Sequence, residues 1–167
     1  VGDPSDEATQ LGPMANQTKF AKVMGILKDA ANDGVKPILG GPEPEPSGES
    51  GYYIQPTIFA GLSQDHMLAK EEIFGPVLVV IPYKDIEEAI AIANDTQYGL
   101  SSYVYASTEH MAENISRRMK SGMVHINGAP LVAEAPFGGY KQSGNGREWG
   151  RYGIYEFLEV KAVMKVS

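Results

Sequence analysis

The sequence predicts an α/β fold with a largely parallel sheet, flanking helices and an edge strand at the C-terminus. Strand-like and helix-like segments alternate between residues 77 and 126, which favours parallel strands joined by helical crossovers. Residues 77–81 are apolar throughout, as expected of a strand that is buried on both faces. Residues 157–166 alternate apolar with charged side chains, which is typical of a strand with one solvated face.

The N-terminal elements follow from capping and periodicity. Residues 1–14 are rich in Gly, Pro and Asp and predict a loop. Asn16 is suited to cap a helix that runs to about residue 33, and Gly34 supplies its C-terminal stop. The expected buried face of this helix holds Phe20, Val23, Leu27 and Ala30.

The next expected elements are short. Residues 36–39 predict a strand, and residues 40–51 form a polar, Pro-rich excursion. Residues 52–59 resemble a strand, but Pro56 cannot donate to a sheet, so an edge position or a bend is expected there. A helical turn is expected over residues 67–70.

The alternation from residue 77 onward gives the clearest boundaries. Asp85 and Glu88 form a capping-box pattern that opens a helix to about residue 93, and residues 102–105 predict a strand. Thr108 opens the next helix, Gly122 ends it, and residues 123–126 form the following strand. Apolar side chains at helical spacing, expected in the core, are Met111, Ile115 and Met119.

Composition excludes several classes of function. The 167 residues are 43% hydrophobic and carry a formal net charge of -7, so neither nucleic acid nor a membrane is expected as a partner. There is no cysteine, which excludes a disulfide framework, a thiolate metal site and a cysteine nucleophile within these residues. With no visible signal segment, a cytoplasmic location is expected. The start at Val1 instead of Met fits a processed terminus or a cut from a longer chain.

The segment 71–77 reads Glu-Glu-Ile-Phe-Gly-Pro-Val, with two carboxylates before an aromatic residue and a buried strand. A carboxylate at a strand entrance accepts hydrogen bonds from vicinal hydroxyls such as those of a ribose, and an aromatic ring packs against a flat heterocycle. Read from the residues alone, a solvated carboxylate pair beside a core phenylalanine is the alternative.

A second segment, residues 136–148, reads Pro-Phe-Gly-Gly-Tyr-Lys-Gln-Ser-Gly-Asn-Gly-Arg-Glu. A phosphate-binding loop is excluded, because no Gly-Lys-Ser/Thr occurs and no strand directly precedes the glycines. From the residues alone, a structural glycine loop remains the alternative.

Both segments resemble signatures of the aldehyde dehydrogenase superfamily, and weaker matches extend the resemblance over essentially the whole chain. The resemblance implies that residues 1–150 are the C-terminal portion of the catalytic domain and that residues 151–167 are an oligomerisation segment. It implies an NAD or NADP cofactor, an aldehyde substrate, and a homo-oligomer in which the terminal strand pairs with another subunit's sheet.

The resemblance also implies roles for individual residues. Glu72 would hold the nicotinamide ribose, and Phe74 would contact the nicotinamide side. Phe137 would line the substrate tunnel, with residues 128–135 at its mouth. Glu148 would assist proton movement near the general base. Asn127 would be structural, near the end of a strand.

The remaining candidates favour ordinary structural roles. No two of the three histidines have metal-ligand spacing, and no metal site is expected. They are His66, His110 and His125.

The implied chemistry needs parts that this chain lacks. In the family a cysteine thiolate attacks the aldehyde to give a thiohemiacetal, hydride passes to the nicotinamide, and an activated water releases the carboxylic acid. The cysteine, the general base and the dinucleotide-binding domain all lie outside these residues. We therefore expect an enzyme portion that is inactive alone. The alternative is a stand-alone, non-catalytic association module with the same fold.

Overall fold

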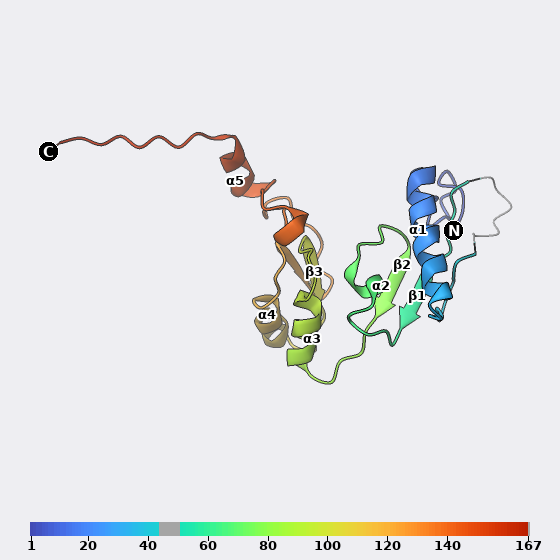
Figure 1. Cartoon of the computed structure of the whole chain (residues 1–167). Coiled ribbons are helices and arrows are strands. Elements are labelled where there is room, and N and C mark those ends of the chain that lie inside the picture. The colour runs from blue at the N-terminus through green and yellow to red at the C-terminus, as the bar shows by residue number, and fades with distance from the viewer. Residues whose placement is uncertain (44–50, 167) are drawn as a thin grey trace. The chain divides into compact units, whose positions relative to one another are not determined.

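The computed structural model describes residues 1–43 and 51–166, and these form two compact units (Figure 1). The first unit covers Val1–Pro82 and the second covers Tyr83–Ser167. The predicted Pro-rich excursion at residues 40–51 lies mostly outside the described residues. The predicted division between residues 150 and 151 stays a prediction.

The first unit is organised around α1, Gln17–Asn32, which confirms the predicted N-terminal helix. The side chain of Asn16 accepts a hydrogen bond of 3.0 Å from the amide of Lys19 and so caps the first turn. Gly34 follows the helix with a φ of 80°, the left-handed conformation that favours glycine. The buried side chains of this helix are Val23, Met24, Leu27 and Ala30.

Two parallel strands, β1 (Thr57–Ala60) and β2 (Val77–Val80), complete this unit with the short helix α2 (Met67–Lys70). Strand β1 begins only after Pro56, so the strand predicted from residue 52 is wrong in its first half. The strand predicted over residues 36–39 is also wrong, because only Leu39 forms an isolated bridge, to Ile58. The predicted turn at residues 67–70 is confirmed.

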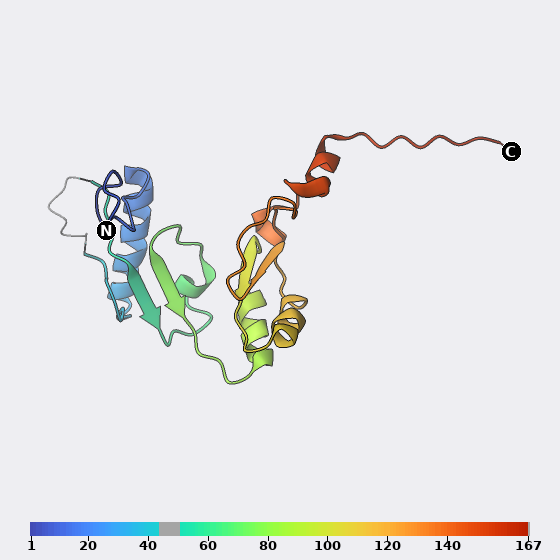
Figure 2. The same cartoon turned by 180° about the vertical axis from the view of Figure 1, so that it is seen from behind.

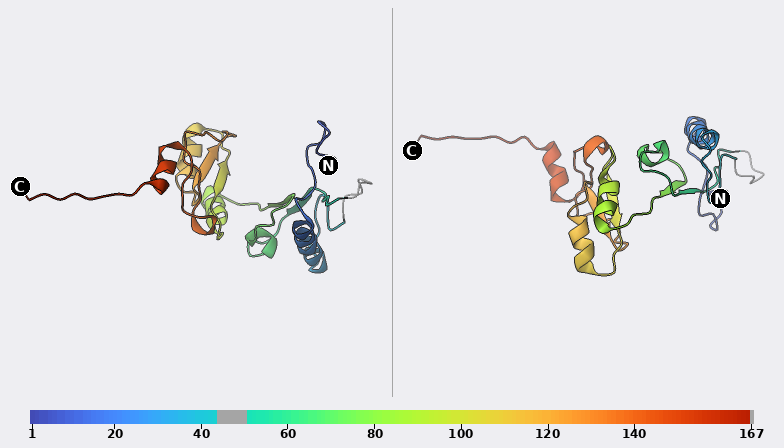
Figure 3. Two further views of the ribbon diagram at one scale, coloured as in Figure 1. Left: turned by 90° about the horizontal axis from the view of Figure 1, so that it is seen from above. Right: turned by 60° about the horizontal axis from the view of Figure 1, so that its bottom comes forward.

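The core of the first unit lies on one face of its sheet. Helices α1 and α2 lie on the same side of the two strands (Figure 3), and Phe59 and Leu68 are buried there together with the apolar face of α1. The other face is open: Leu78 is 57% exposed and Val80 is 47% exposed. The expectation that residues 77–81 are buried on both faces is therefore wrong for this chain, because both helices cover the same side.

The second unit confirms the predicted alternation. Its elements in order are α3 (Ile86–Asn94), β3 (Ser101–Val104), α4 (Glu109–Ser116) and β4 (Met123–Ile126). Strands β3 and β4 pair in parallel, as the helical crossover requires. Both predicted caps are present, with Asp85 accepting from the amide of Glu88 and Thr108 from the amide of Met111.

One ion pair ties α3 to the end of α4. The guanidinium of Arg118 donates two hydrogen bonds, of 2.6 and 2.5 Å, to the carboxylate of Glu87. These bonds lower the pKa of Glu87 and raise the pKa of Arg118. Met111 is 38% exposed, so its predicted place in the core is wrong. The buried apolar side chains of these elements are Ile90, Val104 and Ala112.

The C-terminal part of the second unit contains η1 (Lys141–Ser143), α5 (Gly150–Gly153) and η2 (Ile154–Phe157). Residues 158–166 follow as an extended segment that belongs to neither sheet of the described chain (Figure 2). Val160 is 95% exposed and Met164 is 87% exposed. The predicted edge strand thus pairs with nothing within the described residues, and its pairing with another subunit stays a prediction.

Among the described residues, no helix is both long and apolar enough to cross a membrane.

Candidate functional site

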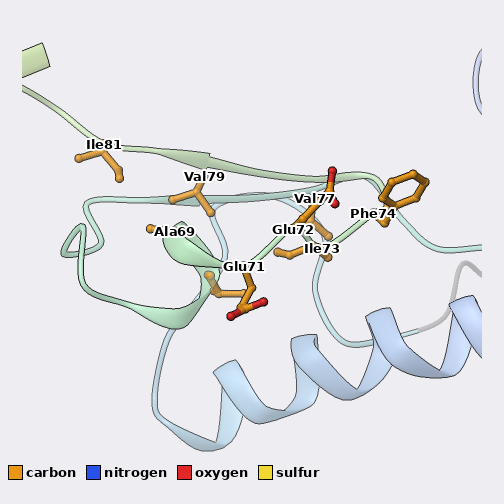
Figure 4. A pocket seen from close by; sticks show the side chains of 10 residues that line it. Ala69, Glu71, Glu72, Ile73, Phe74, Val77, Val79 and Ile81 are labelled. Atoms are coloured by element: carbon orange, nitrogen blue, oxygen red, sulfur yellow. The ribbon is translucent and has the colours of Figure 1, made fainter. Parts of the chain in front are cut away.

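The first site is a pocket of about 500 Å³ in the first unit, beside the segment that joins α2 to β2 (Figure 4). Glu72 and Phe74 both contribute to its lining, so the structure brings together the two residues expected at a cofactor site. Glu71 lines the pocket as well, but the carboxylates of Glu71 and Glu72 point to opposite sides of this segment (Figure 4). The apolar lining residues include Leu68, Ile73, Val77, Val79 and Ile81.

The backbone at residues 73–75 displays Phe74 to solvent. Ile73 is buried in the core of the unit with 7% exposure, whereas the Phe74 side chain is 68% exposed. Phe74 has a φ of 53°, a left-handed conformation that a bulky side chain rarely adopts. Its ring lies 5.5 Å from the ammonium of Lys19 on α1. The alternative of a core phenylalanine at position 74 is wrong, because this side chain is exposed. An exposed aromatic ring on a strained backbone is a feature of ligand sites.

Two side chains of this pocket are the candidates for holding a nicotinamide ribonucleotide. The Glu72 carboxylate is exposed and accepts hydrogen bonds only, as the two hydroxyls of a ribose require. The exposed ring of Phe74 suits a flat heterocycle. These two side chains lie two residues apart on either side of the buried Ile73, which fixes the backbone between them.

The second site is built in the second unit by the glycine-rich segment 136–148. Its turn packs on the loop after α3. The ammonium of Lys141 donates hydrogen bonds of 2.9 Å to the carbonyls of Asn94 and Thr96, and Ser143 accepts a 3.0 Å bond from the amide of Gly99. Lys141 and Ser143 of the signature thus hold the loop in place.

Two glycines make this packing possible. A Cβ added at Gly122 would lie 1.9 Å from the carbonyl oxygen of Gly138, so the start of β4 and the signature touch backbone to backbone. Gly138 itself has a φ of 157° and its missing side chain faces the carbonyl of Gly146. The glycines are therefore required for close approach within the chain, and a phosphate-binding role is not needed to explain them.

The docked segment sets Phe137 opposite Glu148. The amide of Phe137 donates to the carbonyl of Glu148 at 2.8 Å, and the amide of Glu148 donates back at 2.7 Å. These two residues therefore form an antiparallel bridge. Phe137 is half-buried and lines two neighbouring pockets, of about 340 and 350 Å³, and Glu148 lines the second of them. The sequence-predicted substrate residue and proton-relay helper are thus direct neighbours.

Residues 128–135 border the pocket of about 340 Å³. Five of these eight residues line it: Ala129, Pro130, Leu131, Val132 and Ala135. Asn127 precedes them with a φ of 48°. Its side-chain oxygen accepts a 2.9 Å hydrogen bond from the amide of Ala106, and its own amide donates to Val104. These bonds tie the end of β4 to the end of β3, in agreement with the structural role expected for Asn127.

The three histidines occupy separate environments. His66 accepts from the amide of Leu68 and caps α2, and His110 lies beside Asn114 on α4. His125 is buried, stacks on Tyr103 with ring centroids 4.7 Å apart, and contacts the carbonyl of Ala129 at 2.8 Å. In the described part of the chain, no three His, Cys, Asp or Glu side chains are grouped as a metal site.

Sequence reasoning missed two residues of the second site. Lys141 is part of the glycine-rich signature, and its ammonium bridges two carbonyls more than forty positions earlier in the chain. The ring centroid of Trp149 lies 5.1 Å from that of Phe137, and Trp149 lines the same pocket. A lone tryptophan directly after the signature was the available signal for the second residue.

Comparison with known proteins gives one consistent result. Residues 1–163 match the family model described as "Aldehyde dehydrogenase family". A curated relative, a 3-succinoylsemialdehyde-pyridine dehydrogenase of a Pseudomonas species, is 51% identical over 164 residues, which are 98% of this chain and 34% of that protein.

Solved structures agree with the sequence match. An aldehyde dehydrogenase C mutant from Pseudomonas syringae, in complex with NAD+ and octanal, superposes with a TM-score of 0.93 at 45% identity and covers 97% of this chain. An aldehyde dehydrogenase from Mycobacterium tuberculosis in complex with NAD+ gives a TM-score of 0.87 at 42% identity, covering 93% of this chain. The chain spans about a third of the length of these proteins: 33% and 32%.

Proposed function

The chain belongs to the aldehyde dehydrogenase family, and on that premise we propose that it is a portion of an NAD(P)-dependent enzyme that oxidises an aldehyde to a carboxylic acid. The observation that carries this proposal is the pairing of an exposed Glu72 carboxylate with the displayed ring of Phe74 at one pocket. This pairing presents a hydroxyl acceptor and an aromatic face side by side, as a nicotinamide ribonucleotide requires.

In the first unit the chain's own residues bind and orient the cofactor. The bound dinucleotide supplies the hydride acceptor of the reaction. Glu72 would accept hydrogen bonds from the ribose, and Phe74 would limit the movement of the nicotinamide ring. Because the left-handed backbone of Phe74 is fixed before binding, little conformational freedom is lost when the ring is engaged.

In the second unit the residues shape the space for the aldehyde. Phe137 supplies an apolar wall, and residues 128–135 form the tunnel mouth. Glu148 is held opposite Phe137 by two backbone hydrogen bonds, and its exposed carboxylate is available to move a proton toward the general base.

The nucleophile comes from outside these residues. The family reaction passes through a cysteine thiohemiacetal, and the chain contains no cysteine. The chain also spans only 34% of the curated relative. We therefore propose that the catalytic cysteine and the general base belong to the remainder of a longer protein, and that the 167 residues alone are inactive.

The substrate is an aldehyde in this proposal. Two similar proteins support this substrate class, since one is a 3-succinoylsemialdehyde-pyridine dehydrogenase and the other was solved with octanal. The cofactor is NAD or NADP, and the solved relatives carry NAD+. The cytoplasmic location expected from the sequence stays a prediction.

Residues 158–166 are the proposed oligomerisation segment. Apolar side chains at every second position are exposed in the single chain, with Val166 at 101% and Val160 at 95%. The segment is already extended and its backbone amides are free of sheet partners within the described chain. Such a segment is suited to add a strand to the sheet of another subunit.

The direct test compares the pure 167-residue chain with the longer protein that contains it. Both are incubated with an aldehyde and NAD+ or NADP+, and the reduced cofactor is followed by its absorbance. The proposal expects turnover by the longer protein and none by the 167 residues. Turnover by the 167 residues would contradict it, and a longer protein without activity would favour the non-catalytic association module.

A further inference from the structure

Trp149 forms a wall of the pocket of about 340 Å³ in the second unit, and the proposed function leaves this residue without a role. The indole is 43% exposed. Its ring centroid lies 5.1 Å from that of Phe137, with 45° between the ring planes, a tilted arrangement that aromatic pairs prefer. The two rings therefore act as adjoining walls of one pocket.

The backbone holds this indole in an unfavourable conformation. Trp149 has a φ of 62° and Gly150 a φ of 54°, and the first value is rare for a bulky side chain. Hydrogen bonds on both sides maintain it: Glu148 pairs with Phe137, and the amide of Gly150 donates to the carbonyl of Ala133 at 3.1 Å. Strained positions that are held by their surroundings cluster at ligand sites. The strained backbone of Trp149 at the pocket wall therefore indicates that the indole contacts a ligand.

The chemistry of the pocket defines what Trp149 would contact. None of its lining residues in the described chain is Lys, Arg, Asp or Glu. The one titratable side chain, His125, contacts the carbonyl of Ala129 through Nδ1 at 2.8 Å; because a carbonyl only accepts, this nitrogen carries the hydrogen. The other side chains of the wall are mainly aliphatic or aromatic, among them Leu131, Val132, Pro136 and Phe137.

We propose that Trp149 is a specificity-determining residue that packs, with Phe137, against the uncharged, apolar body of the aldehyde. A charged substrate would lose its hydration here without gaining a partner. A short aldehyde would leave the indole uncovered and gain little from it. The pocket therefore selects long or bulky apolar aldehydes over short or charged ones. This inference rests on the proposed dehydrogenase function and specifies its substrate class.

The kinetic test uses the longer enzyme and a ratio within each variant. The quantity measured is kcat/KM for decanal divided by kcat/KM for acetaldehyde, so a general loss of folded enzyme cancels. Trp149→Ala is expected to lower this ratio about tenfold, because the contact with the long chain is lost. Trp149→Phe is expected to keep it within about threefold, because an aromatic wall remains. An unchanged ratio in Trp149→Ala would overturn the proposal.

Tyr152→Ala is the matched control. Tyr152 is an exposed aromatic residue three positions further along the chain and is absent from the pocket lining. The ratio is expected to stay unchanged in this variant. A fall equal to that in Trp149→Ala would also overturn the proposal, because it would assign the effect to the local fold instead of the indole.

A binding test separates this inference from the proposed function. This chain contains one tryptophan, and the test uses the longer protein with every tryptophan outside this chain replaced by Phe, so that the fluorescence reports on Trp149 alone. Octanamide, an unreactive neutral probe, is expected to protect the indole from quenching by acrylamide, whereas acetamide is not, and Phe137→Ala should remove the protection. The measurement needs neither thiol nor NAD+. Protection without any dehydrogenase activity in the longer protein would contradict only the proposed function; activity without protection would contradict only the role of Trp149.

Discussion

Phe137 and Glu148 exchange two backbone hydrogen bonds, of 2.8 and 2.7 Å, and so lie directly opposite each other in the second unit. The ten residues between them, 138–147, form a glycine-rich loop. Hydrogen bonds of Lys141 and Ser143 hold this loop against the loop after α3. The spacing of a substrate-lining ring and a proton-moving carboxylate is thus set by backbone geometry. This spacing of Phe137 and Glu148 therefore depends on how tightly the glycine-rich segment packs.

The first prediction concerns that packing. Gly122→Ala is expected to destabilise the second unit by about 3 kcal/mol, since the added Cβ would overlap a backbone oxygen that cannot rotate away. That oxygen, of Gly138, is only 1.9 Å from the Cβ position. The measurement is the free energy of unfolding in urea. Gly146→Ala is the control, because nothing lies within 4 Å of its Cβ position; equal losses in the two variants would refute the packing argument.

The second prediction concerns the cofactor pocket. In the longer enzyme, Glu72→Gln is expected to slow hydride transfer by about tenfold or more, because an amide replaces a charged acceptor for the ribose hydroxyls. The measurement is the rate of reduced-cofactor formation in a single turnover. Glu71 lines the same pocket, but its carboxylate points to the other side of the segment (Figure 4), so Glu71→Gln is the matched variant for which a smaller effect is expected. A hydride step unaffected by Glu72→Gln would remove this residue from the site.

The third prediction follows from the ion pair between Glu87 and Arg118. The guanidinium donates two bonds to the carboxylate and holds the pKa of Glu87 below its ordinary value of 4.5. A depressed pKa means that the stabilisation is present above the unfolded value and is lost as the pH falls through the folded value. The pKa of Arg118 is raised, so this side chain keeps its charge throughout.

The expected result is a difference in stability between the parent chain and Glu87→Gln that exists near neutral pH and disappears in acid. Because the pair is exposed, the difference should also shrink at high salt. Thermal unfolding across pH at low and high ionic strength measures both effects. Glu109→Gln is the control, because Glu109 also lies in the first turn of a helix whereas the ion pair to Arg118 is made by Glu87. A difference that grows toward acid pH would contradict the assignment.

The fourth prediction concerns assembly. Removal of residues 156–167 from the longer enzyme is expected to lower its oligomeric state, because the exposed apolar positions of residues 158–166 would no longer be available to another subunit. Light scattering coupled to size exclusion gives the mass directly. An oligomer of unchanged size after the deletion would remove the segment from the interface.

Local sequence signals predicted the elements that local forces determine. The caps at Asn16, Asp85 and Thr108 are all formed as the side-chain pattern requires. Strands β3 and β4 lie within about a residue of their predicted bounds, because a capped helix and a glycine stop leave little room between them. Glu72 and Phe74 likewise line one pocket, because each is the direct neighbour of the buried Ile73 along the chain.

The errors concern segments whose conformation or burial depends on residues far away in the sequence or on another molecule. Residues 36–39 have strand composition but only Leu39 finds a partner. Residues 77–81 are apolar enough for burial on both faces, yet Leu78 and Val80 are exposed because both helices of the unit cover the opposite face. Lys141 reaches a loop more than forty positions away, a contact that no spacing rule reveals. Each of these outcomes depends on tertiary packing, which the sequence pattern alone does not encode.

The central claim is that these 167 residues act as part of a longer aldehyde dehydrogenase. Its most direct test is the mass of the native protein in its source cells, detected with an antibody raised against this segment. The account predicts a species several times larger than the 18.0 kDa of this chain, with a cysteine and a general base in the additional sequence. A native species of 18.0 kDa would contradict the account, and would mean that the cell makes a thiol-free protein whose binding partner must then be identified.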